Sequence, residues 1–294
     1  MRSRREFLTT MAAGLGAAAV GARRLSAAGK AAIETALSGP VGLQLWSLRE
    51  HLPKDLPGTL AKVRAMGFTE VEGAGLWGHT LQDLRAALDT AGLRCQSTHL
   101  GFERLRDDAA VALAEAKGLG ATWAVCPWIP HDKTFTKDDA SRSAEAFNRF
   151  GKAARDAGLG FAYHCHGYEF VPSGQGTLWD TLVAGTDPEL VAFQIDVFHA
   201  FNGGGDPVAV IEKLNGRVPS LHVKDIAKGL TITAGSSGAE PEADVPVGTG
   251  QVDWPAVLKA AKKAGTSLYY IEDESPDPLG HIPKSLQYLE GLKL

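Results

Sequence analysis

Short apolar runs alternate with longer helix-forming segments from Val41 to the C-terminus, and this alternation restricts the fold more than any other feature of the sequence. Residues 41–294 divide into eight units of about 32 residues each, which is the size of one strand and one helix in a barrel of ~250 residues. The sequence therefore predicts a single (β/α)8 TIM barrel. The expected strands are Val41–Trp46, Glu70–Glu72, Arg94–Thr98, Trp123–Pro127, Gly160–His164, Val191–Asp196, Ser220–Lys224 and Leu268–Glu272.

Glycines lie between many of the expected helices and the strands that follow them. Glycine adopts the left-handed conformation that closes a helix C-terminus without a steric penalty, so this recurrence supports the assignment. The glycines concerned are Gly67, Gly92, Gly120, Gly158 and Gly265. An open doubly wound sheet is the alternative fold, but it usually begins with a glycine-rich phosphate loop. Here the first strand leads into Trp46-Ser47-Leu48-Arg49, which favours the closed barrel.

One segment, from Ala227 to Val252, interrupts the repeat. It is longer than an ordinary connection between a strand and a helix, and it is rich in glycine and proline. Long loops inside compact domains are often lids or binding loops, and the alternative is a tolerated surface insertion. The sequence leaves both interpretations open.

The N-terminus has the pattern of an export signal. A basic segment with Arg4 and Arg5 precedes a weakly apolar Ala/Gly-rich stretch, and small residues end it at Ala28. The Ser-Arg-Arg-x-Phe-Leu string resembles a twin-arginine signal. We expect a signal peptide at 1–28, a linker at 29–40, and a periplasmic barrel domain at 41–294 without a stable membrane anchor. A frayed basic tail is the alternative.

Charge and cysteine content exclude several classes of protein. Residues 1–28 contain five Arg and one Glu, so their removal changes the formal net charge from −4 to −8. No basic surface for nucleic acid is therefore expected. Cys95, Cys126 and Cys165 are widely spaced and form no C-x-x-C motif, which argues against a disulfide framework or a structural zinc knuckle. We expect three buried thiols.

Polar side chains gather where the last four predicted strands end. Because side chains alternate along a strand, two residues that are two positions apart share a face. The pairs are His164 with His166, Gln194 with Asp196, His222 with Lys224, and Tyr270 with Glu272. Carboxylates at this end of a barrel need a counter-charge, and oxygen-rich ligation with an imidazole suits Mn²⁺, Mg²⁺ or Co²⁺. For each residue alone, a satisfied polar group at the start of a loop is the alternative.

Several of these segments resemble the xylose-isomerase-like sugar phosphate isomerase/epimerase family. The resemblance covers roughly Val41 to Leu294, and its most specific strings are His-Val-Lys-Asp at 222–225 and Gly-x-Gly-x-Val-Asp-Trp at 248–254. It implies a (β/α)8 barrel that binds one divalent metal ion through Glu, Asp, His and Glu on strands five to eight. The other strings that carry it are His164–Phe170, Gln194–Asp196 and Ile271-Glu272.

The resemblance implies that Asp196, His222 and Glu272 are metal ligands, together with a residue of strand five. Where many relatives carry Glu on that strand, this chain has His164, with Glu169 five residues later. We assign Glu169 as the ligand because a carboxylate preserves the charge balance, and His164 is the alternative. The expected ion is Mn²⁺, with Mg²⁺, Co²⁺ or Zn²⁺ as alternatives.

The expected reaction is isomerisation or epimerisation of a small sugar or keto-sugar. The proton next to a carbonyl is removed, and an enediolate forms. The catalytic candidates are Glu169, Glu272, His166 and Lys224, and Asp225 or a backbone carbonyl is expected to accept a hydrogen bond from His222. Aromatic and polar residues at the strand ends would bind the sugar, and the candidates are Trp46, Glu72, His99, Trp128, His164 and His199.

Two other functions remain open. A lyase or dehydratase would use the same enediolate to eliminate a substituent from a 3-keto-glycoside or an inosose. A non-catalytic sugar-binding barrel would keep the aromatic residues but need no paired carboxylates. The acidic charge disfavours the DNA-cutting endonuclease branch of the same superfamily. The oligomeric state is open, and a homo-oligomer is compatible with the sequence.

The twin-arginine assignment predicts that export depends on Arg4 and Arg5. Cells that produce the Arg4→Lys, Arg5→Lys double variant should retain the protein in the cytoplasm, as measured by fractionation and immunoblotting. Unchanged delivery of this variant to the periplasm would contradict the assignment.

Overall fold

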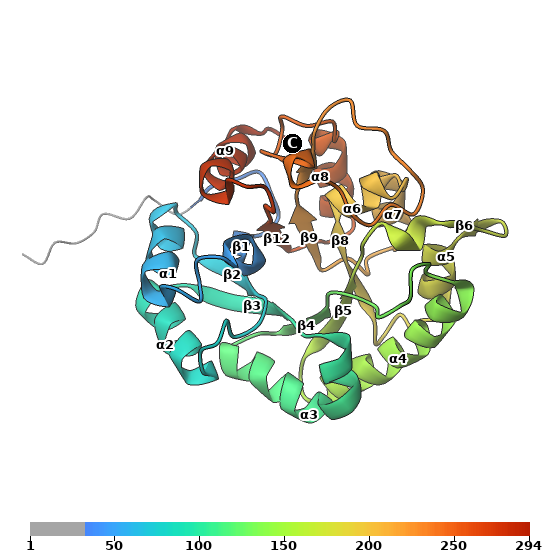
Figure 1. Cartoon of the computed structure of the whole chain (residues 1–294), viewed down its shortest axis with the longest axis horizontal. Coiled ribbons are helices and arrows are strands. Elements are labelled where there is room, and N and C mark those ends of the chain that lie inside the picture. The colour runs from blue at the N-terminus through green and yellow to red at the C-terminus, as the bar shows by residue number, and fades with distance from the viewer. Residues whose placement is uncertain (1–32) are drawn as a thin grey trace, which may run out of the picture.

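The computed structural model describes residues 33–294 as a closed barrel of eight parallel strands, which confirms the predicted fold class (Figure 1). Around the barrel the strands follow the order β1-β12-β9-β8-β5-β4-β3-β2. The expected signal peptide lies outside the described residues. The barrel strands are β1 (Val41–Gln44), β2 (Glu70–Gly73), β3 (Arg94–His99), β4 (Trp123–Cys126), β5 (Gly160–His164), β8 (Ala192–Asp196), β9 (Ser220–Val223) and β12 (Leu268–Ile271).

Helices surround the barrel and cover its outer face (Figure 1). Many begin at a residue whose side chain accepts a hydrogen bond from the first turn, and α2, α4 and α5 each have a Thr/Asp capping box. No helix of the described residues is both long and apolar enough to cross a membrane. The helices are α1 (Leu56–Ala65), α2 (Leu81–Ala91), α3 (Phe102–Leu119), α4 (Lys137–Asp156), α5 (Leu178–Ala184), α6 (Val197–Asn202), α7 (Pro207–Lys213), α8 (Trp254–Lys263) and α9 (Pro278–Gly291).

The five glycines expected to end helices all have a positive φ. Their φ angles range from 68° at Gly92 to 108° at Gly67, so each occupies the region that favours glycine. The prediction made from the sequence is therefore confirmed at every position. The three cysteines are free and buried, which is also as predicted.

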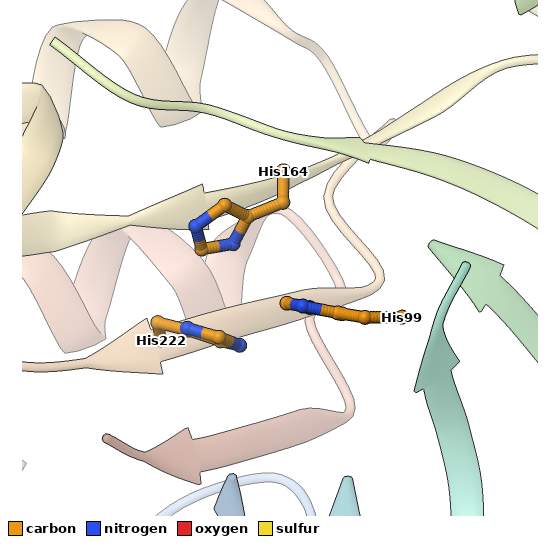
Figure 2. Close-up of side chains that lie close together, drawn as sticks. All are labelled: His99, His164 and His222. Carbon is orange, nitrogen blue, oxygen red and sulfur yellow. The ribbon is translucent and has the colours of Figure 1, made fainter. Parts of the chain in front are cut away.

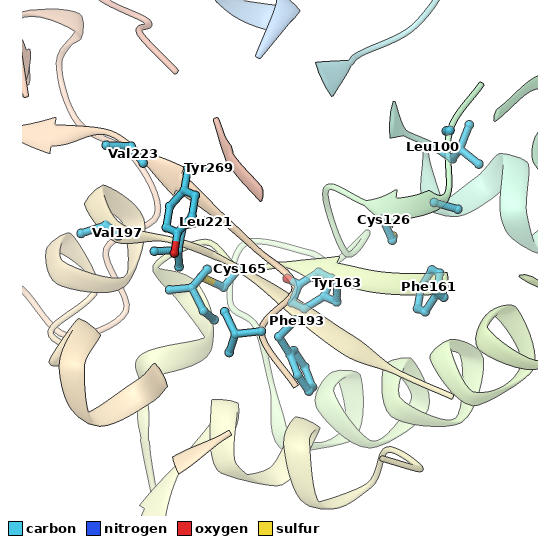
Figure 3. Close-up of a cluster of buried hydrophobic side chains, with 14 of the residues drawn as sticks. Leu100, Cys126, Phe161, Tyr163, Cys165, Phe193, Val197, Leu221, Val223 and Tyr269 are labelled. Carbon is cyan, nitrogen blue, oxygen red and sulfur yellow. The ribbon is translucent and has the colours of Figure 1, made fainter. Parts of the chain in front are cut away.

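Strand β5 shows how alternation separates the core from the site. Phe161 and Tyr163 point outward and contact Phe147 of α4, with ring centroids 5.7 and 4.7 Å away. Figure 3 shows these two rings in the buried apolar cluster between strands and helices. His164, the next residue, turns the other way and contacts Gln194 of β8, with which it is in register. The parallel register also places Asp196 beside His222 and His222 beside Tyr270.

The 227–252 segment is anchored at both ends. The strand β10 (Asp225–Ile226) pairs with β11 (Asp244–Val245), and a short 3₁₀ turn, η3 (Pro241–Ala243), precedes β11. In between, the amide of Gly235 donates to the carbonyl of Gly203 at 3.0 Å, and the Asn202 side chain donates to Ser236 at 3.2 Å. The segment therefore packs against the end of α6, the helix that follows β8.

Asp225 holds the Gly-x-Gly-x-Val-Asp-Trp string. Its buried carboxylate accepts hydrogen bonds from the amides of Ile226, Gly248, Gly250 and Val252 and from the indole of Trp254. The expectation that Asp225 accepts from His222 is wrong, because both ring nitrogens of His222 contact glutamates instead. Hydrogen bonds to Asp225 therefore join the two most specific strings of the sequence, residues 222–225 and 248–254.

Replacement of Asp225 by Ala should destabilise the barrel strongly. Several buried donors lose their acceptor, and each unsatisfied donor costs about 1–3 kcal/mol, so a loss of at least ~3 kcal/mol in the free energy of unfolding is expected in urea titrations. Asp253→Ala is the matched control, because Asp253 only caps α8 through Ala256 and should cost about 1 kcal/mol. Equal losses in the two variants would contradict this role of Asp225.

Candidate functional site

Three residues from neighbouring strand ends form a carboxylate–imidazole group. Asp196 ends β8, His222 lies in β9, and Glu272 directly follows β12. One ligand atom from each lies within 4.8 Å of the others, and all three side chains are buried. The ring of His222 lies 2.5 Å from Glu272 through Nδ1 and 3.6 Å from Asp196. The structure therefore brings together three of the four predicted metal ligands.

His222 lies between two carboxylates. Its Nε2 is 2.5 Å from Glu72 Oε2, on the opposite side of the ring from Glu272. Burial alone would lower the pKa of His222, but the charges of Glu272 and Glu72 hold that pKa well above its usual value. Each ring nitrogen therefore lies within hydrogen-bond distance of a carboxylate oxygen. Despite burial, the pKa of Glu72 lies well below its usual value because His99 and His222 face it.

Gln194 organises the floor of the site. Its amide nitrogen donates to Glu72 at 2.8 Å and to Ser220 at 3.0 Å, and this orients the amide oxygen toward two imidazoles. That oxygen lies 2.9 Å from Nε2 of His99 and 2.9 Å from Nδ1 of His164. Because an amide oxygen only accepts, both of these ring nitrogens carry a hydrogen. The tautomers of His99 and His164 are thereby defined.

Figure 2 shows the rings of His99, His164 and His222 facing one another inside the barrel. The rings of His99 and His222 stack with centroids 5.4 Å apart, and His164 lies across them with its centroid 4.5 Å from that of His222. Nitrogen atoms of the three rings also lie within 4.8 Å of one another. The imidazoles are therefore packed closely around one side of the carboxylate–imidazole group.

Asp196 provides the test of whether a metal ion fits. Its Oδ1 accepts from the amide of His199 at 2.7 Å and so caps α6. Its Oδ2 is buried without a hydrogen-bond partner among the described residues. An unsatisfied buried carboxylate oxygen is costly, and a divalent cation would satisfy it. The donor set of two carboxylates and one imidazole fits such an ion, with Asp196, His222 and Glu272 as ligands.

Glu169 does not join this group, in contrast to the sequence prediction. The chain leaves β5 at His164 and turns into a 3₁₀ segment, η2 (Tyr168–Phe170), which carries Glu169 behind the barrel wall. There its carboxylate accepts from the Tyr163 hydroxyl and from the amide of His166. Burial raises the pKa of Glu169 to about 8, although these hydrogen bonds oppose the shift. On strand five the side chain that faces the group is His164.

A cavity of about 460 Å³ opens above the group. Among the predicted substrate-binding and catalytic residues, seven line it: Trp46, His99, Trp128, His164, His166, His199 and Glu272. Trp46 and Trp128 are each 41% exposed and form open aromatic surfaces. Glu72 does not line the cavity, because it is fully buried beneath His222.

Lys224 belongs to a second cavity of about 310 Å³ that adjoins the first. Its ammonium group pairs with Glu274 and lies 3.8 Å from Asp244, while residues of the 227–252 segment form the outer wall. Trp128, His166, His199 and Glu274 line both cavities. The segment therefore acts as a wall of the site, as the binding-loop interpretation expects.

Sequence reasoning did not assign roles to Gln194, Glu274 or Asp244. Gln194 shares a strand face with Asp196, and this spacing in the sequence could have predicted that Gln194 belongs to the site. Glu274 lies two residues beyond Glu272, and its carboxylate accepts from the Trp46 indole at 2.9 Å. Asp244 lies far along the long loop, and only the pairing of β10 with β11 brings it to Lys224. No local pattern in the sequence predicts that contact.

The closed barrel carries at its carboxyl end a buried carboxylate–imidazole group that could hold a metal ion. The sequence matches the family of xylose isomerase-like TIM barrels over residues 60–293, and the chain belongs to that family. The fold agrees, since a sugar phosphate isomerase/epimerase from Parabacteroides distasonis superposes with a TM-score of 0.71 at 28% identity. That superposition covers 89% of this chain and 97% of the other.

Two further relatives bear on the site. An inosose dehydratase of Lacticaseibacillus casei is 28% identical over 178 residues, and the match spans 55% of this chain and 56% of that enzyme. The matched region is thus little more than half the length of this curated relative. An IOLI protein solved with a zinc atom bound has the same fold, with a TM-score of 0.66 at 17% identity over 85% of this chain and 95% of the other.

The geometry predicts which variants lose the ion of the carboxylate–imidazole group. In protein loaded with Mn²⁺, His222→Ala should lose most of the bound ion, because it deletes the central ligand, whereas Glu169→Gln should retain Mn²⁺ at the wild-type level. Elemental analysis of both variants after desalting measures this, and circular dichroism confirms that each variant is folded. Loss of metal in Glu169→Gln with retention in His222→Ala would place the ion elsewhere.

Proposed function

We propose that the protein is a divalent-metal-dependent enzyme that removes a proton next to the carbonyl of a sugar-like substrate. The observation that carries the proposal is the buried group of Asp196, His222 and Glu272 at the floor of a cavity with open aromatic walls. When bound there, a divalent ion would polarise the carbonyl oxygen and favour loss of the neighbouring proton. Mn²⁺ is the proposed ion, with Mg²⁺, Co²⁺ and Zn²⁺ as alternatives.

Glu272 is the proposed general base. It lines the cavity, and its Oε2, which faces His222, would be the oxygen that holds the ion, so Oε1 is left for the substrate. Burial opposes its ionisation, but the charges of Lys224 and His222 hold the pKa of Glu272 well below its usual value. The carboxylate is therefore ionised at neutral pH and able to accept a proton. The Lys224 ammonium would balance the negative charge that develops on the substrate.

An elimination explains the distribution of carboxylates best. Epimerisation through two bases needs a proton acceptor on each face of the substrate, but Glu169 is held away from the cavity, and Glu274 is paired with Lys224 and Trp46. A single carboxylate can remove the proton and return it to a hydroxyl that departs from the same face. The relatives named inosose dehydratase support this outcome. We therefore propose a dehydratase or lyase that acts on an inosose or a 3-keto-glycoside.

Isomerisation or epimerisation is the second candidate. The similarity to a sugar phosphate isomerase/epimerase at 28% identity favours it, and His164 would then replace the missing carboxylate on strand five. A phosphorylated substrate is not proposed, because Arg104, which lines the cavity, is paired through both terminal nitrogens with Glu115. Export to the periplasm, proposed from the N-terminal sequence, also fits a glycoside or free keto-sugar.

Solvent exchange and a variant of Glu272 test the chemistry. Wild-type protein with Mn²⁺ is incubated with an inosose, a 3-keto-glycoside or a ketose in D₂O, and NMR reads the product. An unsaturated product or a released aglycone indicates elimination, and deuterium at the reacting carbon of an isomer indicates the second candidate. Glu272→Gln should lower turnover by at least ~10²-fold, because a general base typically contributes 10²–10⁴-fold.

The exposed Glu189→Gln is the control for the charge change and should leave turnover at the wild-type level. Product that retains every original C–H bond would refute proton abstraction. Full activity of Glu272→Gln would refute the assignment of the base while leaving the reaction class intact.

A further inference from the structure

A second group of potential ligands lies beside the carboxylate–imidazole group and consists of histidines alone. His164 ends β5, His166 follows it by two residues, and His199 lies in α6. One ring nitrogen from each lies within 4.8 Å of the others. The ring centroid of His166 is 4.9 Å from that of His164 and 4.7 Å from that of His199. We refer to these residues as the three-histidine group.

The nitrogens of this group lack the partners that buried imidazoles normally have. Nδ1 of His166 and Nδ1 of His199 are buried and have no hydrogen-bond partner among residues 33–294. His164 donates from Nδ1 to Gln194, so its Nε2 carries a lone pair. Nearly all buried polar atoms in proteins have a hydrogen-bond partner, so two unpaired buried nitrogens in one cluster point to a ligand there.

The charges around this group suit a cation. Four carboxylates of the same region, those of Glu72, Asp196, Glu272 and Glu274, provide negative charge near the cluster and outnumber the single ammonium of Lys224.

We propose that His164, His166 and His199 bind a second divalent transition-metal ion, of which Zn²⁺ is the expected example. Tetrahedral zinc holds imidazole nitrogens at ~2.0–2.1 Å, hence about 3.4 Å from one another. From separations of at most 4.8 Å, each ring needs to move inward by less than about 1 Å. The group lines both cavities through His166 and His199, so the fourth position would face the substrate space.

The two groups differ in the metals that they favour. Two carboxylates and one imidazole accept hard ions such as Mn²⁺ and Mg²⁺, whereas an all-imidazole site favours Zn²⁺, Ni²⁺ or Cu²⁺. The second site therefore fills with zinc but not with Mg²⁺. It requires no sugar substrate, so it stands independently of the proposed reaction.

Zinc stoichiometry tests the proposal. Protein stripped with a chelator is equilibrated with Zn²⁺, desalted and analysed by mass spectrometry for metal per chain. Wild type should hold two zinc ions, and the same protein loaded with Mg²⁺ should hold at most one. His166→Phe keeps a ring against Trp128 and Tyr168 but has no ligand nitrogen, and it should hold one zinc ion. His199→Ala should likewise hold one.

Three controls make each outcome decisive. His222→Ala should retain the zinc of the three-histidine group, and His51→Ala, a histidine outside both cavities, should retain two ions. Circular dichroism and the remaining zinc ion show that each variant is folded. The proposal would be overturned if both His166→Phe and His199→Ala kept the zinc content of the wild type. It would also be overturned if the wild type held a single zinc ion and only His222→Ala lost it. A single ion lost only in His166→Phe and His199→Ala would support this site and refute the Asp196 site.

Discussion

The contact between His222 and two buried carboxylates is the interaction on which the floor of the site depends. One glutamate comes from β2 and the other from the end of β12, and the ring lies between them at 2.5 Å on each side. Each group would be costly to bury alone, and together they offset that cost. Glu72 in turn accepts from Gln194, which orients His99 and His164. Removal of His222 and its two glutamates would therefore leave the rings of His99 and His164 without a defined orientation.

Much of the fold could be predicted because its signals are periodic. The eight apolar runs and the glycines after the helices follow directly from strand burial and from the left-handed C-cap, and both are found in the structure. The convergence of Asp196, His222 and Glu272 was also predictable, because all three lie on or next to barrel strands whose inward face alternation defines. In a regular strand, the position of a residue determines the direction of its side chain.

Glu169 shows where that reasoning ends. It lies only five residues beyond His164, but Gly167 and η2 redirect the chain, so strand alternation no longer applies. Charge balance suggested a carboxylate ligand at this position, whereas the structure places the carboxylate against Tyr163 and a backbone amide. Asp225 is a second example, since four of its five partners lie more than twenty residues further along the chain. Contacts made by irregular backbone depend on tertiary packing that a single sequence does not reveal.

The two anchors of the 227–252 segment have a consequence for how the protein can diversify. The β10–β11 pair and the Asp225 carboxylate fasten both ends of the segment to the barrel, while residues 237–241 between them form one wall of the second cavity. Insertions, deletions or substitutions between the anchors alter the cavity wall without changing a barrel strand. The segment can therefore be exchanged in evolution or by design to reshape the cavity, while the carboxylate–imidazole group at its floor stays constant.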